Sequence, residues 1–208
     1  MKGYFVTGTD TNAGKTVVSA YLMQALDGDY WKPVQSGFDG ETDTEAVRRL
    51  TGLPSERFHR SAYELRAPLS PHESARRDGI SISLDAFKLP RTPRPLIVEG
   101  AGGVLVPLNG DALMIDLIKR LALPVILVAR STLGTINHTL LSLEALRTRR
   151  VEIAGVIMNG APNEANRIAI ETYGRVHVLA EMPILAPLNT ETIGAFARAH
   201  PLQHTAIA

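Results

Sequence analysis

Two spacings of hydrophobic residues alternate along this chain. Short apolar runs rich in β-branched residues are typical of strands buried on both faces, whereas longer, largely apolar segments are typical of helices. The short runs predict strands near Tyr4–Thr7, Tyr30–Lys32, Leu96–Glu99, Val125–Ala129, Ile153–Met158 and Val176–Ala180. The longer segments predict helices near Lys15–Leu26, Thr44–Leu50, Ile115–Leu121, Thr135–Thr148, Glu164–Tyr173 and Glu191–Ala199. Because strands and helices take turns, we expect an α/β fold with a doubly wound, mostly parallel sheet flanked by helices.

The stretch from about Thr51 to Pro95 departs from this alternation. Prolines at positions 54, 68, 71, 90, 93 and 95 predict loops and short helices there. No repeat or disordered linker divides the chain, so we expect a single domain over residues 1–208. The tail after Pro201 is expected to be frayed.

Composition narrows the classes of function. The 208 residues carry a net charge of +1 and no dense basic face, which argues against nucleic acid as the main partner. The absence of cysteine excludes a disulfide, a thiolate metal site and a thiol nucleophile. No apolar run reaches membrane length, and Met1 leads directly into the first strand without a signal peptide. We therefore expect a soluble cytoplasmic protein with no membrane contact.

The segment Gly8–Thr16 lies between the first strand and the first helix. A glycine-containing loop in this position is typical of P-loop NTPases, in which backbone N–H groups at the helix start bind phosphate. Lys15, expected to face solvent around the phosphates, reaches the β- and γ-phosphates, and the Thr16 hydroxyl binds Mg²⁺. Five residues rather than four separate the glycines, which makes this a deviant Walker A loop. The alternative is a plain glycine-rich turn. The nucleotide-binding residues expected here are Asn12, Ala13, Gly14, Lys15, Thr16 and Val17.

Charged side chains follow the second and third predicted strands. Ligands of such sheets bind beyond the carboxyl ends of the strands. The third strand ends in Glu99, which favours a Walker-B-like acid for Mg²⁺; its alternative role is to cap the glycine turn Gly100-Ala101-Gly102. Lys32 either is solvated or offsets charge on a phosphoryl group. Asp43 either caps the following helix or joins the Mg²⁺ shell, and both readings stay open.

Polar residues also follow the later strands. The segment Gly134–Asn137 opens a helix, and a helix start can bind a carboxylate, although its residues can also be simple caps. His138 is expected to be a partly buried packing residue rather than a base. The side chain of Asn159, which precedes Gly160, can bind a nucleobase edge or make an ordinary turn.

Taken together, these segments resemble the dethiobiotin synthetases, P-loop enzymes of the biotin pathway. The opening motif combined with the segment around Lys32 is specific to this family. The matching segments, in chain order over nearly the whole sequence, are Phe5–Thr11 with Gly14–Thr16, Tyr30–Gly37, Ser70–His72, Val98–Gly103, Leu105–Leu108, Leu123–Val128 and Leu133–His138.

The resemblance implies an ATP- and Mg²⁺-dependent ligase that acts on 7,8-diaminopelargonic acid (7,8-diaminononanoate) and CO₂. One amine takes up CO₂ as a carbamate, which attacks the γ-phosphate of ATP and gives a carbamic–phosphoric anhydride. The second amine then closes the ureido ring and releases phosphate. Such chemistry needs positioning and charge stabilisation rather than a protein nucleophile.

The resemblance also implies roles for individual residues. Lys15 and Lys32 stabilise the carbamate and phosphoryl oxygens, and Thr11 and Ser36 bind the diamine. The implied metal ligands are Thr16, Asp43 and Glu99. The implied nucleotide contacts beyond the P-loop are Asp43, Glu99, Gly100, Ala101, Gly102, Asn159, Gly160, Pro183, Ile184 and Leu185, with Asn189 as a further candidate near the base. The helix start made by Gly134, Thr135, Ile136 and Asn137 meets the substrate carboxylate bound in the neighbouring subunit, which implies a homodimer.

A ParA/MinD-like switch ATPase is the main rival from another class. Such proteins share the long P-loop and the sheet, but their loop carries an extra lysine where this chain has Thr9, Asp10 and Thr11. The chain also lacks an amphipathic C-terminal membrane helix. An amidotransferring relative would need a nucleophilic cysteine, which is absent.

Overall fold

The computed structural model describes residues 3–38 and 40–202. Its strands are β1 (Gly3–Gly8), β2 (Asp29–Trp31), β3 (Val34–Ser36), β4 (Phe58–His59), β5 (Tyr63–Leu65), β6 (Leu96–Gly103), β7 (Val125–Arg130), β8 (Ile153–Asn159) and β9 (Val178–Met182). Its helices are α1 (Lys15–Leu26), α2 (Asp43–Thr51), α3 (Pro71–Arg77), α4 (Met114–Leu121), α5 (Thr135–Thr148), α6 (Glu164–Gly174) and α7 (Thr190–Ala199), with short 3₁₀ turns at Ser55–Arg57 and Leu84–Ala86.

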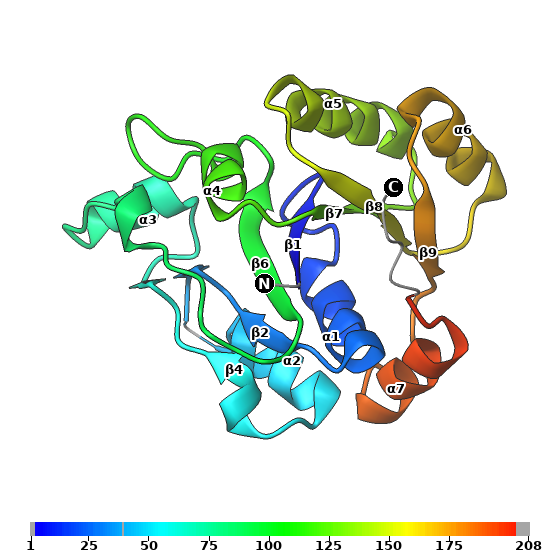
Figure 1. The fold of residues 1–208 in the computed structure, drawn as a ribbon, viewed down its shortest axis with the longest axis horizontal. Helices are drawn as coiled ribbons and strands as arrows, with labels where there is room; N and C mark the ends of the chain where they lie inside the picture. The colour runs from blue at the N-terminus through cyan, green and yellow to red at the C-terminus, as the bar shows by residue number, and fades with distance from the viewer. Residues whose placement is uncertain (1–2, 39, 203–208) are drawn as a thin grey trace.

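Seven strands form one parallel sheet in the order β4-β2-β6-β1-β7-β8-β9, which confirms the predicted α/β fold (Figure 1). β1, which leads into the P-loop, is the central strand. Three short strands were not predicted: β4 extends the edge of the main sheet, and β3 pairs with β5 in a separate two-stranded sheet. Each of them has two or three residues, too few to show a strand periodicity.

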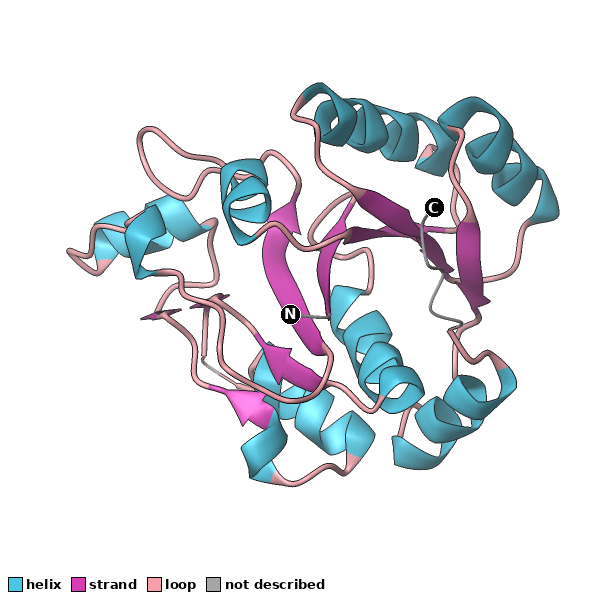
Figure 2. Ribbon diagram, in the orientation of Figure 1, coloured by secondary structure: helices cyan, strands magenta, loops and turns pink. Residues whose placement is uncertain are grey.

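Alternate residues of the central strands bury their side chains in two different cores. Phe5 packs with residues from α4, α5 and α6, whereas Val6 packs with residues from α1, α2 and α7. Figure 2 shows these helices on the two faces of the sheet. This two-sided burial explains why the strands read as nearly continuous hydrophobic runs.

The predicted strands are found with shifted boundaries, and two of them, β6 and β9, differ by two or more residues at an end. β9 covers Val178–Met182 rather than Val176–Ala180. Arg175 takes a left-handed conformation (φ 45°) at the end of α6, and the chain then needs Val176 and His177 to turn back toward the sheet. The predicted loops and short helices between Thr51 and Pro95 are confirmed.

The prediction for the tail concerns residues that are largely outside the described ones, which stop at Leu202. Within residues 3–38 and 40–202, no helix combines the length and hydropathy needed to span a membrane.

Candidate nucleotide and metal site

The P-loop connects β1 to α1 through Gly14. This glycine has φ 96°, in the left-handed region, and a Cβ placed on it would lie 1.9 Å from Nδ2 of Asn159. Only glycine fits there. The same Nδ2 atom donates a hydrogen bond to the carbonyl oxygen of Ala13 at 3.1 Å. Asn159, at the end of β8, therefore holds the loop where α1 begins.

Lys15 is buried, so the expectation that it faces solvent is wrong. Its side chain folds back into the loop, and Nζ donates to the carbonyl oxygens of Asp10 (2.9 Å) and Thr11 (3.0 Å). Only 5% of the residue surface is exposed. This burial lowers the pKa of Lys15 to about 8, although Glu99 partly opposes the shift. The ammonium lies among groups that it can exchange for phosphate oxygens.

Four side chains from separate elements form a closed ring of contacts beside the P-loop. The Thr16 hydroxyl is 2.9 Å from Oδ1 of Asp43 and 3.1 Å from Oε1 of Glu99. Nζ of Lys32 lies 2.6 Å from Oδ2 of Asp43 and 3.0 Å from the same Oε1 of Glu99. Thr16 lies in the first turn of α1, Asp43 starts α2, Glu99 lies in β6 and Lys32 follows β2, so the ring joins four separate segments of the chain.

The charges in this ring stabilise one another. Burial alone would lower the pKa of Lys32, but Glu99 and Asp43 outweigh it and raise that pKa above its usual value. Burial likewise tends to raise the pKa of Asp43, yet Lys32 outweighs this and lowers it. Lys32 therefore stays a cation and Asp43 a carboxylate.

The oxygen atoms of this ring fit a magnesium ion. Thr16 Oγ1 is near both carboxylates but has one proton, so it can donate to only one of them at a time. A hydroxyl and carboxylates are the donors that Mg²⁺ prefers, with waters and substrate phosphates completing its shell. Among residues 3–38 and 40–202, no group of three or more His, Cys, Asp and Glu side chains is placed to hold a metal ion.

Asp43 is not the N-cap of α2, which corrects one of the two readings of this residue. Thr42 is the cap: its hydroxyl accepts from the backbone N–H of Glu45, whose carboxylate accepts from the N–H of Thr42. This capping box leaves the Asp43 side chain free to contact Lys32 and Thr16.

Glu99 and the glycines after it lie at the end of a strand longer than predicted. β6 continues to Gly103, and Glu99 is almost fully buried. A Cβ on Gly100 would be 2.9 Å from the Phe5 ring, and Gly102 has φ 67°. Ala101 lies between them, partly buried. These glycines therefore serve close packing and a left-handed turn beside the acid.

Sequence reasoning missed Tyr30. Its hydroxyl donates to Oε2 of Glu99 at 3.0 Å, and the residue is completely buried. Tyr30 and Lys32 are two positions apart at the end of β2, where alternate side chains point to the same face. This two-residue spacing could have predicted that Tyr30 lies on the same face of the strand as Lys32 and therefore near the site.

Sequence reasoning also missed a contact between Arg130 and the P-loop. The guanidinium of Arg130, at the end of β7, pairs with Oδ2 of Asp10 at 2.5 Å. The other oxygen of Asp10 accepts from the N–H of Asn12 at 2.7 Å. One carboxylate thus links the loop to a neighbouring strand.

The residues expected to bind the diamine lie on two elements. Ser36 ends β3, and its buried hydroxyl has no hydrogen-bond partner among residues 3–38 and 40–202. Thr11, which is exposed, lines a hollow of about 410 Å³ together with Leu105, His138 and Leu141. His138 is exposed, so its expected partial burial is wrong: it lies on the side of α5 that faces this hollow.

The start of α5 carries the residues expected at the substrate carboxylate. Gly134 has φ 92° and precedes the helix without a side-chain cap. Thr135 is buried and donates to the carbonyl oxygen of Arg130 at 2.5 Å, whereas Asn137 is exposed and Ile136 partly buried. Leu133, just before them, is fully exposed.

The segments expected near the base come together. The N–H of Gly160 donates to the carbonyl oxygen of Met182, which places Asn159-Gly160 beside Pro183. Ile184 is exposed and Leu185 partly buried. Asn189 instead caps α7 by accepting from the N–H of Thr192. The side-chain oxygen of Asn189 is therefore already used in this cap.

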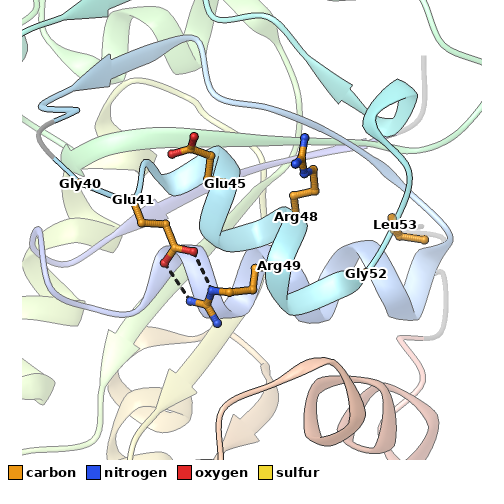
Figure 3. A pocket seen from close by; sticks show the side chains of 7 residues that line it. All are labelled: Gly40, Glu41, Glu45, Arg48, Arg49, Gly52 and Leu53. Carbon is orange, nitrogen blue, oxygen red and sulfur yellow. Dashed lines mark hydrogen bonds and ion pairs between the residues drawn. The ribbon is translucent and has the colours of Figure 1, made fainter.

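A larger hollow, of about 650 Å³, lies elsewhere on the surface (Figure 3). It follows the outer side of α2, where Glu41 and Arg49 form an exposed ion pair at 2.6 Å. None of the expected site residues lines it. Charged surface side chains around a shallow depression do not make a phosphate site.

The class of protein follows from this geometry and from two comparisons. A family model described as an AAA domain matches residues 2–192. A solved ParA family ATPase from Chlorobium tepidum TLS shares the fold with a TM-score of 0.54 at 13% identity, covering 95% of this chain and 98% of that one. A chain of the MinC:MinD cell division protein complex from Aquifex aeolicus shows a similar likeness, with a TM-score of 0.51 at 12% identity and coverage of 97% of this chain and 87% of that one. The chain has the fold of the P-loop NTPases.

Closer relatives give the family. The chain is 58% identical over 193 residues to the ATP-dependent dethiobiotin synthetase BioD of Paramagnetospirillum magneticum, covering 93% of each. The protein of the same name from Nitrobacter hamburgensis is 52% identical, with coverage of 90% and 89%. The biotin biosynthesis bifunctional protein BioCD of Bordetella avium is 51% identical over 96% of this chain but 43% of its own length. This chain belongs to the dethiobiotin synthetase family, and it is an enzyme.

Proposed function

We propose that this enzyme closes the ureido ring of dethiobiotin from 7,8-diaminopelargonic acid and CO₂, with ATP as the co-substrate. The observation that carries the proposal is the ring formed by Lys32, Asp43, Glu99 and Thr16 next to a loop that fits phosphate. A switch ATPase shares the fold, but the family relationship favours the ligase over it.

The reaction needs no group on the protein to form a covalent bond. An oxygen of the substrate carbamate attacks the γ-phosphorus, the bond from that phosphorus to the β,γ-bridging oxygen breaks, and ADP leaves. The second amine then attacks the carbamate carbon. The C–O bond to the phosphoryl group breaks, a proton leaves the nitrogen, and phosphate departs with the former carbamate oxygen.

Lys15 and Lys32 are the cations that would stabilise charge in these steps. Each is buried and each lies beside oxygen acceptors that a phosphate or carbamate oxygen can replace. A lysine held in a dry site interacts strongly with a developing negative charge. We place Lys15 on the β- and γ-phosphates and Lys32 between the carbamate and the γ-phosphate.

Thr16, Asp43 and Glu99 would hold Mg²⁺. When bound, this ion would neutralise charge on the triphosphate and favour departure of ADP. The protein supplies the oxygen donors and, through Lys32, keeps the two carboxylates oriented.

We further propose that the enzyme is a homodimer with the substrate at the interface. Thr11 and Ser36 would bind the diamine within one subunit, and the start of α5 would bind the substrate carboxylate of the other. The exposure of Leu133, Leu105 and Leu141 near these elements supports an interface, because large apolar side chains are rarely left in water together. Asn159 and the segment 183–185 would border the adenine base.

We also propose that residues 1–208 act as one domain and that the enzyme works in the cytoplasm, where its proposed small-molecule substrates would be found. The parallel sheet and its two cores, which span most of the described chain, support the first of these.

Phosphate release tests the function. Release that requires the diamine and bicarbonate together with Mg²⁺ and ATP, with dethiobiotin detected by mass spectrometry, is the expected result. Phosphate release that ignores the diamine and rises only with a protein or DNA partner would instead identify a switch ATPase.

A further inference from the structure

We propose that Tyr30 is a positioning residue that fixes the Glu99 carboxylate for the metal, a role that rests on the proposed function of the site. The hydroxyl of Tyr30 donates to Oε2 of Glu99 at 3.0 Å. Tyr30 opens one of the segments that carry the family resemblance, yet neither the roles implied by the resemblance nor the mechanism above uses its hydroxyl.

The two oxygen atoms of Glu99 have different surroundings. Oε1 faces the ring of contacts formed with Thr16, Lys32 and Asp43, and it is near Nζ of Lys32 and the hydroxyl of Thr16. Oε2 faces the hydroxyl of Tyr30. The tyrosine therefore takes one oxygen and leaves the other directed toward the groups that would surround the ion. A carboxylate anchored in this way cannot rotate freely about its last bond.

Tyr30 is well suited to act as a permanent donor. The residue is completely buried, and its ring lies 6.0 Å from that of Phe58. A tyrosine hydroxyl keeps its proton at neutral pH and can donate it to a carboxylate oxygen. Hydrogen bonds from an outer layer of residues to metal-binding carboxylates orient those ligands and strengthen metal binding.

Removing the hydroxyl should weaken the metal site without removing a ligand. In Tyr30→Phe, Oε2 of Glu99 would be buried without its donor, and Glu99 could turn away from Thr16 or toward Lys32. We expect the Mg²⁺ concentration that half-saturates binding of a non-hydrolysable ATP analogue to rise about tenfold. Direct binding of Mn²⁺, followed by electron paramagnetic resonance, should weaken by a similar factor.

Tyr21→Phe is the matched control. Tyr21 is also completely buried, and its hydroxyl also donates one hydrogen bond, to the carbonyl oxygen of His200 at 2.7 Å. It lies in α1 on the side of the core formed with α7, and its ring packs against Phe196. This variant should lose stability but keep the wild-type Mg²⁺ midpoint.

Two further variants separate positioning from a general structural effect. In a Glu99→Gln background, Tyr30→Phe should cause no further rise in the Mg²⁺ midpoint, because the tyrosine acts through the carboxylate. Replacing Tyr30 with p-aminophenylalanine restores a donor and should return the midpoint to within about twofold of wild type. The titrations are run in the cold so that loss of one buried hydrogen bond leaves the variants folded.

Several outcomes would overturn the inference. Tyr30→Phe could lower the melting temperature and leave the Mg²⁺ midpoint unchanged, which would make Tyr30 a core residue only. Equal shifts in Tyr30→Phe and Tyr21→Phe, or additive shifts with Glu99→Gln, would do the same. If the wild-type protein itself binds the ATP analogue with no dependence on Mg²⁺, the proposed metal site fails together with this inference.

Discussion

Strand β2 carries a cluster of charged residues at each end, and the two clusters differ in a way that separates structure from function. At its amino end, Asp29 accepts from Nε of Arg57 and from the hydroxyl of Thr92, both at 2.5 Å. Arg57 also pairs with Asp27, and so does Arg94. At its carboxyl end, Lys32 contacts Asp43 and Glu99.

Both clusters contain buried charges, so burial alone does not mark the site. At the amino end, Arg57 also donates to the backbone carbonyls of Asp27 and Gly28, so the cluster ties the start of the strand to its neighbours. At the carboxyl end, one ammonium and one hydroxyl are each shared by the same two carboxylates. The amino-terminal cluster shares its partners too, because Arg57 and Arg94 each pair with Asp27 and Asp29. The difference is position: the carboxyl-terminal cluster lies beside the P-loop, where its partners can be exchanged for those of a ligand. The lesson is that the carboxyl-terminal edge of the sheet, rather than burial or sharing, identifies the functional cluster.

The largest expected effect comes from removing Lys32, the cation that Asp43 and Glu99 share at the carboxyl end of β2. Lys32→Met should lower kcat by about a thousandfold or more, because the developing charge on the transferred phosphoryl group loses its buried partner. Steady-state assays with Mg²⁺-ATP, diamine and bicarbonate measure this. Lys119→Met, which removes an exposed lysine of α4, serves as the control and should behave as wild type. A kcat within tenfold of wild type for Lys32→Met would refute the difference between the two ends.

A substitution in the cluster at the amino end of β2 should lower stability and leave catalysis unchanged. Asp29→Asn should cost about 3 kcal/mol of unfolding free energy, more than a hundredfold in the folding equilibrium, because Arg57 loses a buried charged partner. Urea denaturation measures this loss. The folded fraction should retain wild-type kcat. A large fall in kcat for folded Asp29→Asn would show that the amino-terminal cluster also serves the reaction.

Glu99→Gln sharpens the account of the carboxyl-terminal cluster. The amide keeps its shape but loses the charge, so the Mg²⁺ requirement for activity should rise by about 10- to 100-fold. Mg²⁺ titration of initial rates at fixed ATP measures the change. An unaltered Mg²⁺ response would remove Glu99 from the metal shell.

The smallest expected effect concerns pH. Because burial lowers the pKa of Lys15 to about 8, the free protein loses this proton as the pH rises through 8, whereas phosphate binding favours the ammonium. Nucleotide affinity should therefore fall about tenfold between pH 7 and 9, measured by calorimetry.

Unfolding would not explain that loss of affinity. Between pH 8 and about 10.5, the unfolded chain holds the Lys15 proton that the folded chain has released. The contribution of Lys15 to stability therefore rises with pH in this window. Affinity that stays constant from pH 7 to 9 would show that Lys15 is not the group that titrates.

Much of this site could be predicted because parallel strands bring their carboxyl ends to one edge. That rule, together with the P-loop motif for Thr16, predicted that Thr16, Lys32 and Glu99 would lie near one another. The burial of Lys15 could not be predicted, because it depends on the directions of the carbonyl groups in the loop. β3, β4 and β5 were missed because strands of two or three residues carry no measurable period.

Transfer of oxygen from bicarbonate to phosphate tests the central claim most directly. With ¹⁸O-labelled bicarbonate, unlabelled water, Mg²⁺-ATP and the diamine, each phosphate released in a short incubation should carry one labelled oxygen, because the carbamate oxygen leaves bonded to phosphorus. Phosphate that instead takes its new oxygen from the solvent would show that the P-loop only hydrolyses ATP, and would contradict ring closure through a carbamic–phosphoric anhydride.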